Sequence, residues 1–134
     1  MDAVQVARQL GKAIQEDDRY INTQLAMQKN EEDAGLQAMI EKFNAGREQL
    51  NAEMKNAERD AAKIETMNTE LGALYNEVFA NENMKRYVAA RGELNKMVSH
   101  INQIVNGSVE GKDPDTIEHQ ESCGSSCSSC AGCS

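Results

Sequence analysis

The fold class follows from residues 83–105, which read NMKRYVAARGELNKMVSHINQIV. Apolar side chains and one tyrosine recur there at steps of three, four and seven residues, a spacing that places them on one face of an α-helix. The members of this face are Met84, Tyr87, Leu94, Val98, Ile101 and Val105, with Arg91 as a polar interruption. Such a stripe is typical of a helix that packs along another helix in a coiled-coil-like seam.

This seam needs a second surface to pack against. The backbone entropy lost in ordering so many residues exceeds the free energy that burial of about six apolar side chains can return. The last helix must therefore pack on the rest of the chain or on another chain. We expect the protein to self-associate into a homo-oligomer.

Further apolar stripes upstream predict more long helices. The first helix is predicted from near Asp2 to about Gln28, and Asn30 is predicted to cap the start of the next. The three stripes are Val6, Ala7, Leu10, Ile14 and Ile21; Leu36, Met39, Ile40, Phe43, Leu50 and Met54; and Ile64, Met67, Leu71, Leu74, Tyr75, Val78 and Phe79. Gly46 lies within the second stripe, where a neighbouring helix could approach closely.

The boundaries between these segments differ in how well the sequence marks them. Residues 55–63 contain neither Gly nor Pro, so the chain either runs straight on as a helix or reverses near Asn56. Asn81 or Asn83 is expected to cap the last helix. Asn106-Gly107 is expected to end that helix.

The composition agrees with an all-helical protein. The chain has 134 residues, enough for one ordinary domain, and Pro occurs once, at Pro114. We predict an all-α fold in which long antiparallel helices form a helical bundle over residues 1–107. An acidic linker and a cysteine-rich tail occupy residues 108–134. There is no phosphate-binding glycine loop, nucleophile elbow or paired helical metal motif, so we do not expect an enzyme.

The charge and hydropathy of the chain limit the classes of partner that we expect it to bind. The formal net charge is −8, which repels a phosphate backbone and argues against direct binding of nucleic acid. No apolar stretch approaches the length of a membrane span. The N-terminal residues lack the basic and apolar regions of a signal peptide, so we expect a cytoplasmic protein.

All four cysteines lie close together at the C-terminal end, where residues 122–134 read SCGSSCSSCAGCS. Cys123, Cys127, Cys130 and Cys133 form the pattern C-x3-C-x2-C-x2-C. Four thiolates in a reducing compartment suit an iron–sulfur cluster, such as a 4Fe–4S cluster, or else zinc or another thiophilic metal ion. A redox-active or simply exposed thiol tail is the remaining alternative. A segment this polar is expected to be disordered until a metal orders it.

The two histidines are weaker candidates. His100 lies beside the seam with no Cys or carboxylate at helical spacing, which indicates a surface or boundary residue. His119 lies in the acidic linker, where it could be an occasional metal ligand near the tail but is better interpreted as solvated.

Residues 3–107 resemble the YlbF/YmcA family of small helical bacterial proteins. The resemblance rests on Ala7-x-x-Leu10-x-x-x-Ile14 followed by Tyr20, on the capped start near Asn30, and on the Asn-rich break that leads into Met84-Lys85-Arg86-Tyr87-Val88 and the seam beyond it. Many members have Pro in that break, where this chain has Asn81-Glu82-Asn83.

The resemblance implies a regulatory role. Family members form complexes with each other and with an unrelated partner, and these complexes are linked to RNase Y-dependent mRNA processing and to competence, sporulation and biofilm control. Some members carry iron–sulfur clusters on cysteines. We therefore expect a regulatory adaptor that binds protein partners, including related helical proteins, and holds a cluster on its tail. A zinc- or redox-handling protein and a structural helical oligomer are the alternatives.

Overall fold

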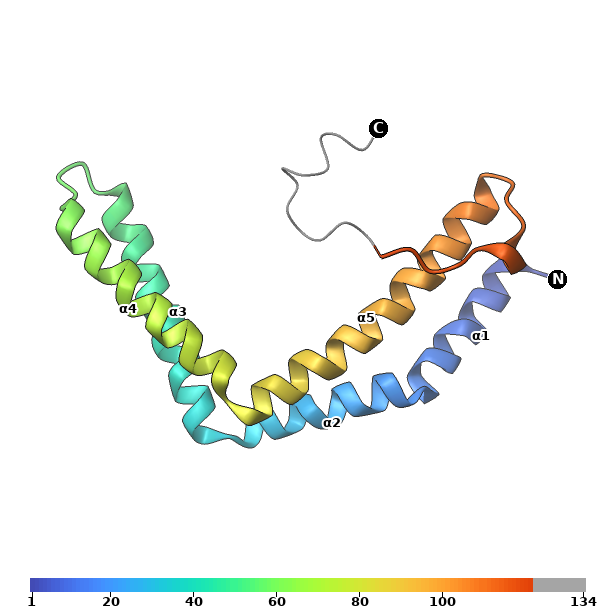
Figure 1. Ribbon diagram of the computed structural model, residues 1–134, viewed down its shortest axis with the longest axis horizontal. Coiled ribbons are helices and arrows are strands. Elements are labelled where there is room, and N and C mark those ends of the chain that lie inside the picture. The colour runs from blue at the N-terminus through green and yellow to red at the C-terminus, as the bar shows by residue number, and fades with distance from the viewer. Residues whose placement is uncertain (122–134) are drawn as a thin grey trace. The chain divides into compact units, whose positions relative to one another are not determined.

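The computed structural model describes residues 1–121 and is helical almost throughout (Figure 1). Its elements are α1 (Ala3–Glu16), α2 (Asp18–Glu32), α3 (Ala34–Lys55), α4 (Ala61–Ala80), α5 (Glu82–Val109) and a short 3-10 helix, η1 (Pro114–Thr116). Residues 1–121 contain no β-strand, so the predicted all-α class is confirmed. The chain divides into two compact units, residues 1–91 and the part from Gly92 onward.

The first predicted helix is wrong in its extent, because the chain breaks at Asp17. The Asp17 carboxylate accepts a hydrogen bond from the backbone N–H of Arg19 at 2.8 Å and caps α2. The Arg19 guanidinium also donates to it at 2.9 Å, and these bonds lower the pKa of Asp17. A residue that caps the start of a helix has a non-helical backbone conformation. Because Asp17 caps α2 in this way, α1 ends one residue earlier, at Glu16.

The predicted cap at Asn30 is also wrong. Asn30 lies inside the last turn of α2, and Asp33 caps α3 by accepting from the backbone N–H of Leu36 at 3.0 Å. The Gln37 side chain donates to the backbone carbonyl of Asn30 at 2.8 Å. A charged acceptor satisfies the start of a helix better than a neutral amide, and only Asp33 separates the two helices.

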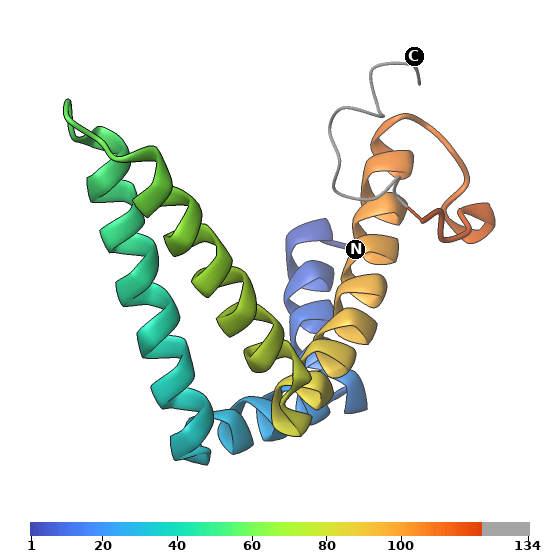
Figure 2. The ribbon, with the colours of Figure 1, turned by 60° about the vertical axis from the view of Figure 1, so that its left-hand side comes forward.

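Helices α3 and α4 form a hairpin and lie side by side in both ribbon views (Figures 1 and 2). Asn56 ends α3 and Asp60 starts α4, so the chain reverses near Asn56 rather than running on. A Cβ atom at Gly46 would stand 2.9 Å from Cδ2 of Leu71. The close helix approach predicted at this glycine is confirmed.

The folded chain buries little apolar surface. Within residues 1–121 the buried apolar side chains are Ala26, Leu36, Leu50 and Val78, and Leu36 is the only large one of them with no exposure. By contrast, Leu25, Met54 and Tyr75 are each at least half exposed. Most positions of the predicted seam in α5 are half-buried, and Val105 is 52% exposed.

Helix α5 runs two residues past its predicted end, to Val109. Gly107 is buried within the helix, because the side chain of Ile117 lies over it, and a Cβ there would be 2.5 Å from Cδ1 of Ile117. Gly111, with φ of +86°, is the glycine that takes the left-handed conformation after the helix.

Candidate functional site

A polar joint connects two turns of the first unit. One oxygen of the Asp33 carboxylate caps α3, and the other accepts from the side-chain amides of Asn81 at 3.1 Å and Asn83 at 3.0 Å. Asn81 in turn caps α5 by accepting from the backbone N–H of Met84 at 3.1 Å, as the sequence predicted. One carboxylate therefore ties the α2–α3 turn to the α4–α5 turn, and its hydrogen bonds, first that from Leu36, lower the pKa of Asp33.

Asn30 lies beside this joint and is 92% buried, since 8% of its surface is exposed. Its side-chain amide donates a weak hydrogen bond to the Met84 sulfur at 3.6 Å, and its buried Oδ1 has no hydrogen-bond partner within the described residues. The side chain links α2 to the first turn of α5. The hydrogen bonds of Asn30 and Asp33 that the structure describes hold turns and helices of the first unit together.

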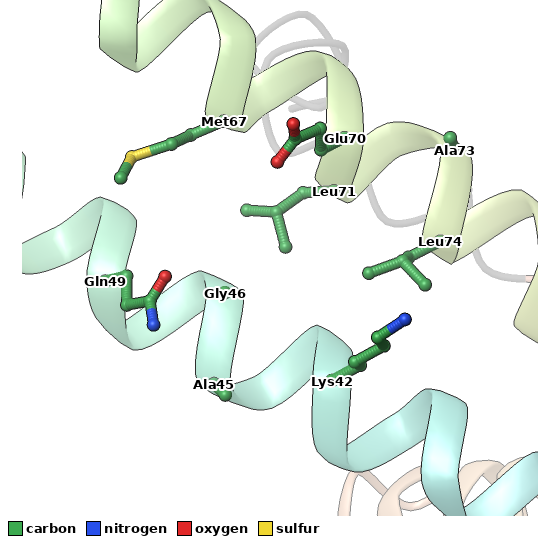
Figure 3. A pocket seen from close by; sticks show the side chains of 9 residues that line it. All are labelled: Lys42, Ala45, Gly46, Gln49, Met67, Glu70, Leu71, Ala73 and Leu74. Carbon is green, nitrogen blue, oxygen red and sulfur yellow. The ribbon is translucent and has the colours of Figure 1, made fainter.

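A shallow groove runs between α3 and α4. Figure 3 shows Met67, Leu71 and Leu74 projecting from α4 toward α3. Gly46 and Ala45 also line the groove on α3, and its polar lining residues, which we call the rim, are Lys42, Gln49 and Glu70. The groove has apolar walls with one charge of each sign at the rim, which suits an apolar side chain of another helix rather than a polar substrate.

The second unit contains a segment that we call the strap, residues 113–121, which folds back along α5 (Figure 1). Gln103 on α5 holds it by donating to the backbone carbonyl of Gln120 at 2.6 Å and accepting from the same residue's N–H at 2.9 Å. Nε2 of His100 is 3.0 Å from the backbone carbonyl oxygen of Ile117. The strap brings His119 to His100, with ring centroids 5.7 Å apart.

Sequence reasoning missed this pair of histidines. Their separation along the chain follows no helical period, since the chain must leave α5 and return before the rings can meet. The turn residues that permit the return, Gly111 and Pro114, were visible in the sequence. The direction in which the chain folds back was not.

The predicted metal ligands Cys123, Cys127, Cys130 and Cys133 lie outside the described residues, so their role stays a prediction. Within residues 1–121, no three His, Cys, Asp or Glu side chains are grouped so that they could hold a metal ion. None of the helices in that part of the chain is both long and apolar enough to cross a membrane.

A family model described as "Control of competence regulator ComK, YlbF/YmcA" matches residues 4–110. The chain belongs to this family. The resemblance drawn from the helical patterns is thus confirmed, and the family's description supports a regulatory role. No curated protein and no solved structure matches the chain. The matched YlbF/YmcA region ends before the strap, so the strap and the cysteines lie beyond it.

Proposed function

We propose that this YlbF/YmcA protein is a regulatory adaptor that acts by binding other proteins through its helices and has no catalytic activity of its own. The observation that carries the proposal is the contrast between few buried and many exposed apolar side chains on well-formed helices. Exposed apolar area of this kind marks surfaces that bind a partner. The family description, which names the control of a competence regulator, supports the regulatory part of the proposal.

The α3–α4 hairpin is the surface that we assign to self-association or to a related family member. Two helices form a single layer, and a second hairpin laid over the groove would complete a four-helix antiparallel bundle. The rim charges of the groove, Lys42 and Glu70, are opposite in sign, as a self-complementary two-fold contact requires. The exposed Tyr75 and Phe79, whose ring centroids are 4.5 Å apart, would extend that contact.

For the tail we propose that Cys123, Cys127, Cys130 and Cys133 hold an iron–sulfur cluster, with zinc as the alternative. The support is the chemistry of the donor set, four thiolates in a short polar segment. A bound cluster would give the protein a group that responds to oxygen and to the redox state of its surroundings. The chain would order its tail around it in a reducing, cytoplasmic setting. The family resemblance links such a protein to RNase Y-dependent mRNA processing and to competence, sporulation and biofilm control.

Light scattering on the full chain tests the adaptor proposal, with Leu74→Asp as the disrupting variant. Leu74 lines the groove, so a charge there should reduce the oligomer to a monomer of unchanged helicity. Asn76→Asp is the matched control, because Asn76 is exposed on the same helix and does not line the groove. Proteins that co-purify with a tagged wild-type chain, but not with Leu74→Asp, would be the regulatory partners.

Two results would contradict the proposal. One is a wild-type chain that stays monomeric and retains no protein partner. The other is an oligomer that Leu74→Asp and Asn76→Asp leave equally intact, since self-association would then use another face.

A further inference from the structure

His100 on α5 and His119 on the strap form a pair of imidazoles in the second unit. Their ring centroids are 5.7 Å apart and their planes are inclined at 59°. Both side chains are half-buried, so they are ordered by their surroundings yet reachable from solvent. Nothing in the proposed adaptor function uses them.

The hydrogen bond of His100 fixes which of its nitrogens carries the proton. A backbone carbonyl only accepts, so Nε2, 3.0 Å from the oxygen of Ile117, must be the donor. In the neutral ring Nδ1 is then the nitrogen with a free lone pair. Histidines that bind metals usually donate their other N–H to a backbone carbonyl or a carboxylate in this way, because the bond holds the ring and increases its basicity.

The position of His119 is held from both sides along the strap. Ile117 is seated against buried Gly107, and Gln120 is bound in both directions by the Gln103 amide. Within residues 1–121 the His119 ring itself makes no hydrogen bond, which leaves its nitrogens available. It lines a small hollow together with Ser99 and the carboxylate-bearing Glu121.

We propose that His100 and His119 together bind a divalent transition-metal ion such as zinc. An imidazole nitrogen binds zinc at about 2.0–2.1 Å, so two rings that share one ion have centroids about 5–6 Å apart, and the observed 5.7 Å lies in this range. Water would complete the coordination shell. The ion would join the strap to α5.

The site is tested in the full chain with all four cysteines replaced by Ser, so that thiolates do not compete for the metal. Zinc is titrated at neutral pH by calorimetry or by competition with a chromogenic chelator. We expect one zinc per chain, with an affinity that falls roughly tenfold or more in His100→Gln and in His119→Gln. Glu118→Gln is the matched control, because it alters the exposed neighbour of His119 and leaves both imidazoles.

Hydrogen exchange provides a second measurement that does not depend on the titration. Zinc that bridges α5 and the strap should slow amide exchange across residues 113–121 in the wild-type strap and not in His119→Gln. Circular dichroism of each variant shows whether α5 remains folded.

The proposal is overturned if the cysteine-free chain binds no zinc, or if both histidine variants bind it as tightly as the control. Either result leaves the adaptor proposal untouched, because that proposal is measured by partner binding. Conversely, loss of self-association would not alter the zinc result.

Discussion

Gly46 offers the sharpest test of the α3–α4 hairpin, because two opposing effects can be separated there. In an open helical position, Gly→Ala stabilises a helix by about 0.8–1 kcal/mol. At Gly46 the added methyl would stand 2.9 Å from Cδ2 of Leu71, and forcing such a contact costs about 1–3 kcal/mol. We therefore expect Gly46→Ala to be neutral or destabilising by up to about 2 kcal/mol.

Gly72→Ala is the matched control for this substitution. Gly72 lies in the middle of α4, and a Cβ there would meet nothing within 4 Å. Gly72→Ala should therefore raise the free energy of unfolding by the full helix-propensity gain. The difference between the two variants measures the packing cost alone.

Urea unfolding followed by circular dichroism gives both free energies. Both variants are measured at one fixed protein concentration, so that any self-association affects them equally. An equal rise in stability for Gly46→Ala and Gly72→Ala would refute the close approach of α3 and α4. Gly46→Leu should extend the trend, since a larger side chain cannot be accommodated by a small shift of Leu71.

The other predictions concern the core, the seam, the joint and the tail. Leu36→Ala should lower the free energy of unfolding by about 2–5 kcal/mol, because Leu36 is fully buried. Urea denaturation measures this change, and a decrease below about 1 kcal/mol would contradict the burial of Leu36. Ile101→Asp should lower the melting temperature and weaken any oligomer, as measured by calorimetry and light scattering, because it places a charge within the apolar seam; an unchanged melting temperature and oligomeric state would show that this face is not buried. The pKa of Asp33 is lowered on folding, so Asp33 stabilises the fold above the ordinary Asp pKa, and this contribution is lost as pH falls through the folded value. Asp33→Asn should therefore make the free energy of unfolding depend less steeply on pH in acid. An unchanged pH dependence would refute this role of Asp33. Anaerobic reconstitution with iron and sulfide should give broad absorption near ~400 nm, weakened by alanine at each of Cys123, Cys127, Cys130 and Cys133; tight zinc without iron would exclude the cluster.

Sequence patterns predicted the helical class, the break before α5 and the close approach at Gly46, because all three depend on local spacing. The caps at Asp17 and Asp33 were harder, since an acid on a helix surface and an acid that ends a helix look alike in sequence. The reversal near Asn56 has no glycine or proline to mark it. The meeting of His100 and His119 depends on how the chain folds back after α5, which no local pattern encodes.

The hydrogen bonds between Gln103 and Gln120 constrain the choice of amino acid at position 103 more strongly than at position 120. Gln120 contributes only its backbone N–H and carbonyl, so any residue except proline can replace it without loss of the pair. Gln103 contributes its side-chain amide, which resembles a peptide group because it offers a donor and an acceptor in the same plane. Neither Glu nor Lys can offer both groups, and Asn is one methylene shorter. Substitutions should therefore accumulate freely at position 120 and be rejected at position 103.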